Sequence, residues 1–296
     1  MSGICLIAAL ASGFLSCVTT TTCDLSHDDA YTMEVFDLPA PGARDSRATE
    51  KRLPGPLSWL GRHELATLVL LILVPAGVWA FVVLADAVTE GETESFDERV
   101  LLALRNRAVV SDPLGPAWVE DMGRDVTALG GTAFLTLLTL AVSGYLLLDS
   151  KRHAALLVLI AVGGGVLLSA TLKLGFARPR PDLFPHGQYV STASFPSGHS
   201  MVSAVTYLTL GALLARVQSR PALKAYVLIL AALLTFAVGA SRVYLGVHWP
   251  TDVLAGWTAG ATWALLCWLV ARWLQRRGQV EGYATETGQA GNGRRS

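Results

Sequence analysis

Charged residues are scarce in this 296-residue chain, and those present balance one another. Only 16% of the residues are Asp, Glu, Lys or Arg, against about 25% in an ordinary soluble domain, and 52% are hydrophobic. Lys plus Arg and Asp plus Glu both total 23, so the excess positive charge of a typical nucleic-acid-binding protein is missing. With a mean hydropathy of +0.46, the composition predicts a membrane protein with no nucleic-acid partner.

Cysteine is also scarce. Cys5, Cys17 and Cys23 lie near the N-terminus, and Cys267 lies in an apolar run. None of them belongs to a C-x-x-C pair, and no His-rich cluster lies beside them. We therefore expect neither a disulfide framework nor a metal site.

Long apolar stretches make up much of the remaining sequence. A helix needs about 20 apolar residues to cross the hydrocarbon core of a membrane. Six stretches approach that length: 66–85, 131–148, 154–172, 201–215, 225–240 and 253–270. We predict an all-α polytopic membrane protein, a bundle of six transmembrane helices within residues 61–275.

Short basic loops indicate the orientation of this bundle. The loops 149–153 and 216–224 and the end of the last stretch, around Arg276, are rich in Lys and Arg. Such loops mark the cytoplasmic side of a cell-membrane protein, so both termini are predicted to be cytoplasmic. The other three connections are predicted to lie on the extracytoplasmic face: 86–130, 173–199 and 241–252.

The two ends of the chain lie outside the predicted bundle. Residues 1–60 are predicted to be an N-terminal cytoplasmic or mis-assigned segment, largely disordered, and residues 276–296 a disordered tail. The run 4–16 is apolar like the core of a signal peptide, but no Lys or Arg precedes it. For residues 1–32, a signal, an additional span and a start at Met33 all stay open.

The longest outer connection contains an amphipathic segment, residues 95–107. Its apolar residues follow helical spacing, with charged residues on the other face: Phe96, Val100, Leu101 and Leu104. The pattern fits a helix that lies in the membrane interface, and equally a helix that packs against the neighbouring spans. The sequence leaves both alternatives open.

Basic residues concentrate in the second outer connection. The stretch KLGFARPRPD, residues 173–182, places Lys173, Arg178 and Arg180 at the end of one span. Basic side chains in such a position can simply reach the lipid headgroups. Lys and Arg are nevertheless usually enriched on the cytoplasmic side of a membrane protein. Their concentration on the outer face therefore predicts a bound anion.

The stretch FPSGHS, residues 195–200, predicts the start of a helix. Ser197 follows a proline near the N-cap, Gly198 lets a ligand approach the backbone, and His199 lies in the first turn. Backbone N–H groups at a helix start favour a phosphate. A capped span with an interfacial histidine is the simpler alternative.

The stretch SRVYLGVHWPTD, residues 241–252, combines a histidine with a carboxylate. His248 and Asp252 are four residues apart, so they share one face if the chain is helical there. Asp252 can accept the imidazole N–H and leave the other ring nitrogen for chemistry, and Arg242 adds a bidentate donor for phosphate oxygens. Such a pair alone is more often structural than catalytic. Three such stretches on one membrane face predict a phosphoryl-transfer site.

The three stretches resemble the signature of the type 2 phosphatidic acid phosphatase superfamily, the membrane lipid phosphate phosphatases. K-x6-R-P stands at 173–181, P-S-G-H at 196–199 and S-R-x5-H-x3-D at 241–252, with every position present. The resemblance implies an integral membrane phosphatase that needs no cofactor or metal ion and acts on a lipid phosphate at the extracytoplasmic face. Undecaprenyl pyrophosphate is the first candidate substrate, and phosphatidylglycerol phosphate, phosphatidic acid and diacylglycerol pyrophosphate are its rivals.

The resemblance also implies a role for each residue. His248 attacks phosphorus and forms a phosphohistidine, Asp252 orients its ring, and His199 protonates the departing oxygen. The remaining predicted site residues hold the phosphate oxygens: Lys173, Arg180, Ser197, Gly198 and Arg242. Because one histidine must be neutral and the other protonated, a bell-shaped pH profile is expected.

Two other classes share parts of this pattern. Soluble vanadium haloperoxidases have the same motifs, but the apolar spans argue against that branch. A non-catalytic lipid-phosphate binder or transporter would use the same basic residues without hydrolysis, although binding alone does not require an oriented nucleophile. The sequence makes no prediction of the oligomeric state.

Overall fold

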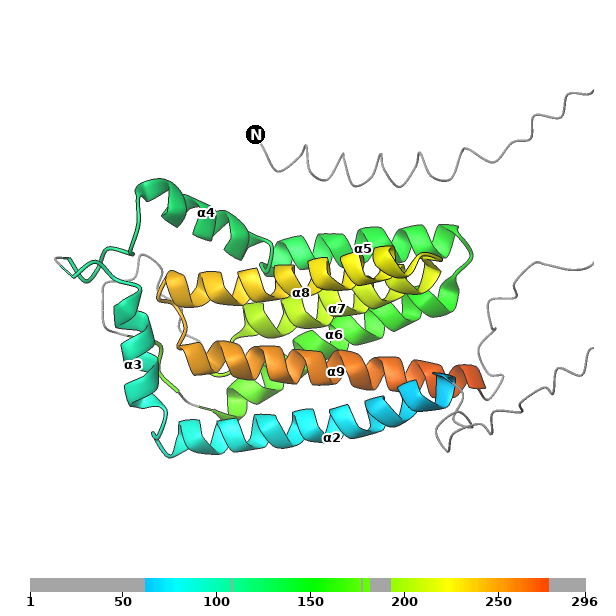
Figure 1. Ribbon diagram of the computed structural model, residues 1–296, viewed down its shortest axis with the longest axis horizontal. Helices are drawn as coiled ribbons and strands as arrows, with labels where there is room; N and C mark the ends of the chain where they lie inside the picture. Colours follow the sequence, from blue (N-terminus) through cyan, green and yellow to red (C-terminus); the bar gives the residue numbers. More distant parts are fainter. Residues whose placement is uncertain (1–61, 108, 177, 182–192, 277–296) are drawn as a thin grey trace, which may run out of the picture. The chain divides into compact units, whose positions relative to one another are not determined.

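A computed structural model (Figure 1) describes four ranges of the chain: 62–107, 109–176, 178–181 and 193–276. They all belong to the second of the two units into which the chain divides, the one that follows Leu53. The predictions for residues 1–60, which include three cysteines, and for the tail 277–296 lie outside the described residues.

Regular secondary structure within the described ranges is helical, which confirms the predicted fold class. An isolated bridge between Arg105 and Pro113 accompanies the helices. Eight helices follow one another in these ranges: α2 (Arg62–Thr89), α3 (Glu94–Ala103), α4 (Ala117–Ala128), α5 (Thr132–Leu148), α6 (Arg152–Gly175), α7 (Gly198–Val217), α8 (Pro221–Tyr244) and α9 (Pro250–Arg276). The six predicted apolar stretches correspond to α2 and to α5 through α9.

Five of these helices are long and apolar enough to cross a membrane, namely α2, α6, α7, α8 and α9. With 17 residues, α5 is about 26 Å long, which is short of a hydrocarbon core of about 30 Å. It follows α4 through a 46° bend, and the two together qualify as a sixth span. Gly130 lies in this bend against α8, where a side chain would collide with Val238.

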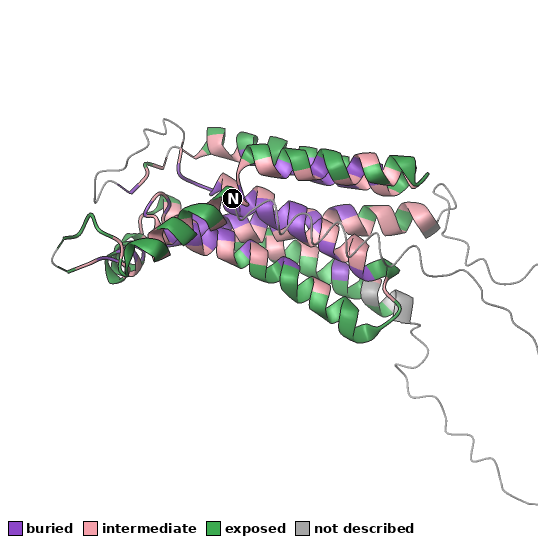
Figure 2. Cartoon of the chain, turned by 90° about the horizontal axis from the view of Figure 1, so that it is seen from above, coloured by how far each residue is buried: buried purple, intermediate pink, exposed green. Residues whose placement is uncertain are grey.

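The most buried span of the bundle is α7. Its apolar window is 56% buried, against 11–33% in the other four spans. One apolar cluster joins α7 to α6 through Val205 and Val158, and another joins it to α5 through Tyr207 and Leu135. Figure 2 shows the buried residues inside the bundle. Outer helices expose apolar side chains, such as the 71% exposed Trp79 of α2, as expected where lipid surrounds the helices.

The two ends of the bundle carry different loops. At one end, α6 and α8 finish and α7 and α9 begin, beside the end of α2 and beside α3 (Figure 1). The basic loops 149–153 and 216–224 lie at the opposite end, with the start of α2. The polar stretches singled out in the sequence therefore meet at the end remote from the basic loops.

Helix α3 packs on the bundle, as the second of the two alternatives for the amphipathic segment predicts. Leu101 is fully buried in a cluster with Val243 and Val253. The helix ends at Ala103 and not at residue 107. The expectation that its charges all lie on the other face is wrong for Asp97, which is fully buried. Asp97 precedes Leu101 by four residues, so the two share a helix face.

Candidate active site

Four helix ends converge around one site. The last turn of α6 contributes Lys173, the last turn of α8 contributes Arg242, and the first turn of α9 contributes Asp252. Ser197 is the N-cap of α7, and Gly198 and His199 are its first residues. Arg180 and His248 come from the segments that precede α7 and α9. All eight residues of the predicted site therefore lie at the same end of the bundle.

His248 and Asp252 are buried together, with side chains 1% and 0% exposed. Nδ1 of His248 lies 3.4 Å from Oδ2 of Asp252, so the proximity expected from their spacing is confirmed. That distance is long for a hydrogen bond. The same oxygen accepts a hydrogen bond of 3.0 Å from the Trp249 backbone N–H and another from the Ser194 hydroxyl, which also lies 3.3 Å from Nδ1.

The other ring nitrogen of His248 faces a cation. Nη1 of Arg180 lies 3.3 Å from Nε2 of His248 and donates to the Val247 carbonyl at 2.9 Å. A guanidinium can only donate, so Nε2 is the acceptor and the ring proton belongs on Nδ1. Burial lowers the pKa of His248 from 6.5 to about 4, against the opposing effect of Asp252. The ring is therefore neutral at neutral pH, the form that a nucleophile requires.

Two cations, Arg180 and Arg242, act on this imidazole. Together with Lys173 they are here called the cationic cluster. Their charges act on one another and on His199. A Cβ at Gly198 would lie 3.4 Å from Nζ of Lys173, which places the start of α7 against the cluster. Nε of Arg242 is buried and has no hydrogen-bond acceptor in the described part of the chain. A buried donor without an acceptor among repelling charges is suited to bind an anion.

The start of α7 is attached to the start of α9. Ser197 is fully buried, and its backbone N–H donates to the Asp252 carbonyl at 3.0 Å. The Ser197 hydroxyl accepts a hydrogen bond of 2.9 Å from Ser200 and makes no side-chain cap bond to the helix. The first amides of a helix have no acceptor within that helix, so the start of α7 can supply backbone donors to an anion.

Further residues around Asp252 were not identified as site residues from the sequence. Nη1 of Arg178 donates to Oδ1 of Asp252 at 2.8 Å, and Nη2 donates to Asp97 at 2.7 Å. In the sequence, Arg178 was noted only as part of the local positive charge. Its position next to the predicted site residue Arg180, in R-P-R-P, was the one feature that could have identified it. Nothing in the sequence marked Ser194 or Asp97 as a site residue. Asp97 is 154 residues distant from Thr251, its other partner, so no local spacing connects the two.

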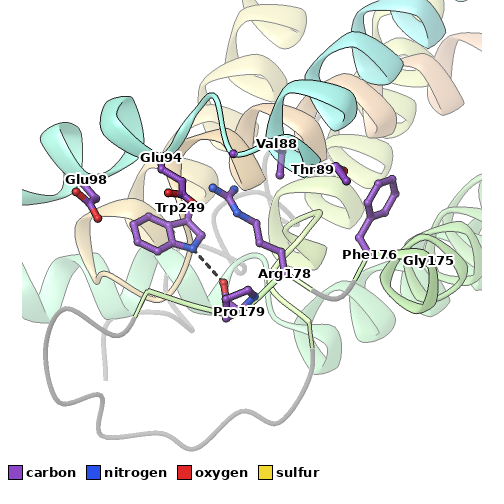
Figure 3. A pocket seen from close by; sticks show the side chains of 10 residues that line it. Val88, Thr89, Glu94, Glu98, Gly175, Phe176, Arg178, Pro179 and Trp249 are labelled. Atoms are coloured by element: carbon purple, nitrogen blue, oxygen red, sulfur yellow. Dashed lines mark hydrogen bonds between the residues drawn. The ribbon is translucent and has the colours of Figure 1, made fainter.

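A cavity of about 480 Å³ lies beside the site, between the end of α2, α3 and the segment after α6 (Figure 3). Arg178, Pro179 and Trp249 form part of its wall, where Nε1 of Trp249 donates to the Pro179 carbonyl at 3.0 Å. Glu94 and Glu98 line it from α3. The described residues that line the cavity include none of the eight predicted site residues, so it is distinct from the cationic cluster.

Comparison with known proteins gives consistent similarities. Residues 154–276 match the PAP2 superfamily. The chain is 36% identical over 183 residues to phosphatidylglycerophosphatase B of Bacillus subtilis, which covers 61% of this chain and 85% of the relative. It is 31% identical over 121 residues to undecaprenyl-diphosphatase of Sulfolobus acidocaldarius, which covers 39% of this chain and 54% of the relative.

The fold is also similar to a solved structure. The crystal structure of a transmembrane PAP2 type phosphatidylglycerolphosphate phosphatase from Bacillus subtilis superposes with a TM-score of 0.59 at 29% identity. The match covers 71% of this chain and 98% of the other. The helical architecture that holds the site is therefore common to the two proteins.

Proposed function

This chain belongs to the PAP2 superfamily, and we propose that it hydrolyses a lipid phosphate or pyrophosphate monoester through a phosphohistidine at His248. One observation carries the proposal. A buried, neutral imidazole stands within a cluster of cations in which Nε of Arg242 lacks an acceptor among the described residues. A phosphate group would supply both the missing acceptor and the missing negative charge.

In the first step, Nε2 of His248 attacks phosphorus, and the bond between phosphorus and the lipid oxygen breaks. The departing oxygen takes a proton from His199. A bound phosphate would favour the protonated form of His199, because its negative charge offsets the charges of the cationic cluster. Asp252, next to Nδ1, stabilises the positive charge that develops on the His248 ring.

In the second step, water attacks the phosphohistidine. His199 now accepts a proton from the water, and the bond between phosphorus and Nε2 breaks to release inorganic phosphate and neutral His248. The cationic cluster and the first amides of α7 bind the non-bridging oxygens in both steps. These groups offset the charge that a metal ion offsets in other phosphoryl-transfer enzymes, so we propose that activity persists in EDTA.

The named relatives support a lipid phosphate as substrate and differ in the headgroup. The relative matched over 85% of its length is named phosphatidylglycerophosphatase B, and the one matched over 54% is named undecaprenyl-diphosphatase. We therefore propose phosphatidylglycerol phosphate and undecaprenyl pyrophosphate as the first two substrates to test. The extracytoplasmic position of the site, opposite the basic loops, is part of the same proposal.

His248→Ala tests the proposed function. Removal of the nucleophile is expected to lower kcat by about 10³-fold or more on every lipid phosphate that the wild type hydrolyses. Phosphate release by the purified protein in detergent measures the effect, with and without EDTA. His153→Ala is the matched control, because His153 is exposed at the opposite end of the bundle and should leave activity unchanged.

The outcomes separate the competing classes. Near-normal turnover by a folded His248→Ala variant would remove the nucleophile assignment. Binding of lipid phosphate by the wild type without any release of phosphate would instead identify a binder or transporter. Complete loss of activity in EDTA that added metal restores would contradict the metal-independent mechanism.

A further inference from the structure

The carboxylate of Asp97 is distant from the motifs in the sequence, but it is buried against them and fully paired. It is 0% exposed, and burial of a carboxylate is costly unless donors surround it. Oδ1 accepts the Thr251 backbone N–H at 3.0 Å. Oδ2 accepts the Thr251 hydroxyl at 2.6 Å and Nη2 of Arg178 at 2.7 Å. Helix α3 is therefore fixed to the first turn of α9 by polar contacts as well as by Leu101.

Arg178 connects this carboxylate to the site. Its Nη1 donates to Oδ1 of Asp252 at 2.8 Å and to the Thr251 hydroxyl at 2.8 Å, while its Nη2 binds Asp97. The side chain is 12% exposed, and its guanidinium lies 5.4 Å from the centre of the Trp249 ring. One planar guanidinium therefore bridges two buried carboxylates with little freedom to turn.

The bridge completes the set of hydrogen bonds to Asp252. Oδ2 is held by Trp249 and Ser194 and lies next to His248, whereas Oδ1 is held by Arg178. Without Asp97, Arg178 would lose one of its two anionic partners, and its charge would be balanced by Asp252 alone. Asp252 would then be less able to stabilise a positive charge on the His248 ring.

From these contacts we infer that Asp97 is a positioning residue for the reaction: through Arg178 it fixes Asp252, and through Asp252 it sets the reactivity of His248. The inference rests on the proposed function. It assigns to α3, a helix of the outer connection outside the signature motifs, a part in the chemical step. It also means that α3 cannot leave the bundle during turnover without breaking this connection.

Asp97→Asn tests the inference, because it removes the charge and nearly preserves the shape. We expect kcat to fall by about 10- to 100-fold, the effect typical of residues that orient a reactive group through a second one. KM should stay within about threefold, because Asp97 does not contact the phosphate site. Asp125→Asn, an exposed carboxylate of α4 in the same connection, is the matched control and should leave both constants unchanged.

A double-mutant cycle identifies the route of the effect. If Asp97 acts through Arg178, the change Asp97→Asn should have little further effect on kcat in an Arg178→Gln background. Full additivity of the two losses would overturn the inference. Equal losses in kcat and in affinity for substrate would do so too, because a positioning role predicts a loss in the chemical step.

A second variant covers the possibility that Asp97→Asn does not fold. Thr251→Val removes one hydroxyl shared by Asp97 and Arg178 without removing a charge, and should lower kcat by about fivefold with KM unchanged. Wild-type kcat in this variant would overturn the inference. An inactive His248→Ala beside a fully active Asp97→Asn would refute this inference alone, whereas an active His248→Ala would refute the proposed function.

Discussion

The side chains around His248 favour the neutral form that the proposed nucleophile requires. Nδ1 is next to Asp252 and Ser194, while Nε2 faces Arg180. Burial disfavours the imidazolium more than the nearby carboxylate favours it, so the pKa of the ring falls to about 4. The ring is thus held in its neutral form over the pH range in which cells live, with the lone pair of Nε2 directed toward Arg180.

This pKa gives a prediction for the pH dependence of kcat/KM, which reports on the free enzyme. His248 must be neutral to attack, so its protonation removes activity as the pH falls through about 4 and not through 6.5. Below that point kcat/KM should fall about tenfold per pH unit. Steady-state rates on a short-chain lipid phosphate measure the profile, and recovery at pH 7 controls for unfolding. If kcat/KM instead fell with a midpoint near pH 6.5 because His248 is protonated there, this prediction would be wrong.

The contact between α7 and α9 keeps the proposed phosphate-binding and nucleophilic parts of the site together. Gly256 and Gly260 lie one turn apart on α9, against α7. A Cβ at Gly256 would lie 2.7 Å from the Ser197 carbonyl, and one at Gly260 would lie 2.5 Å from the Met201 carbonyl. Small residues at this spacing let two membrane helices approach closely. The hydrogen bond from Ser197 to the Asp252 backbone depends on that approach.

Gly260→Ala is expected to separate the two helices. The added methyl meets backbone, which cannot rotate away, so overpacking should cost about 1–3 kcal/mol of stability and also lower kcat/KM. Thermal unfolding in detergent, together with kinetics, measures both. Gly163→Ala in α6 is the control, since a Cβ there meets nothing within 4 Å. Equal stability of the two variants would show that α7 and α9 have room to adjust.

The proposed site and the basic loops lie at opposite ends of the bundle. The site lies where α6 and α8 finish, and the Lys- and Arg-rich loops lie where α5 and α7 finish (Figure 1). Basic loops stay in the cytoplasm during membrane insertion. The same charge pattern therefore supports the proposal that the site lies on the outer face.

Cysteine labelling in intact cells tests this orientation. In a chain whose four native cysteines are replaced by serine, Ser111→Cys should react with a membrane-impermeant maleimide. Arg220→Cys should react only after permeabilisation. Both positions are exposed and lie at opposite ends of the bundle. The reverse pattern would place the site in the cytoplasm, and retained phosphatase activity would show that the substituted chains are folded.

The helical membrane fold could be predicted from the sequence, because apolar stretches long enough to span a bilayer have few other stable structures. The sequence also indicated the grouping of Lys173, His199 and His248, because alternate helix ends must return to the same side of the membrane. Contacts along one helix turn, such as that of His248 with Asp252, follow from spacing alone. The roles of these residues in a reaction stay predictions.

The side chains that complete the site from distant parts of the chain could be identified only from the packing of the helices. Asp97 looks like one more charge of an amphipathic helix, and its burial depends on how α3 packs against α9. Arg178 and Arg180 each precede a proline, yet Arg178 binds two buried carboxylates and Arg180 faces the imidazole. Helical periodicity specifies neighbours within a turn, whereas contacts between helices depend on the three-dimensional fit of their surfaces.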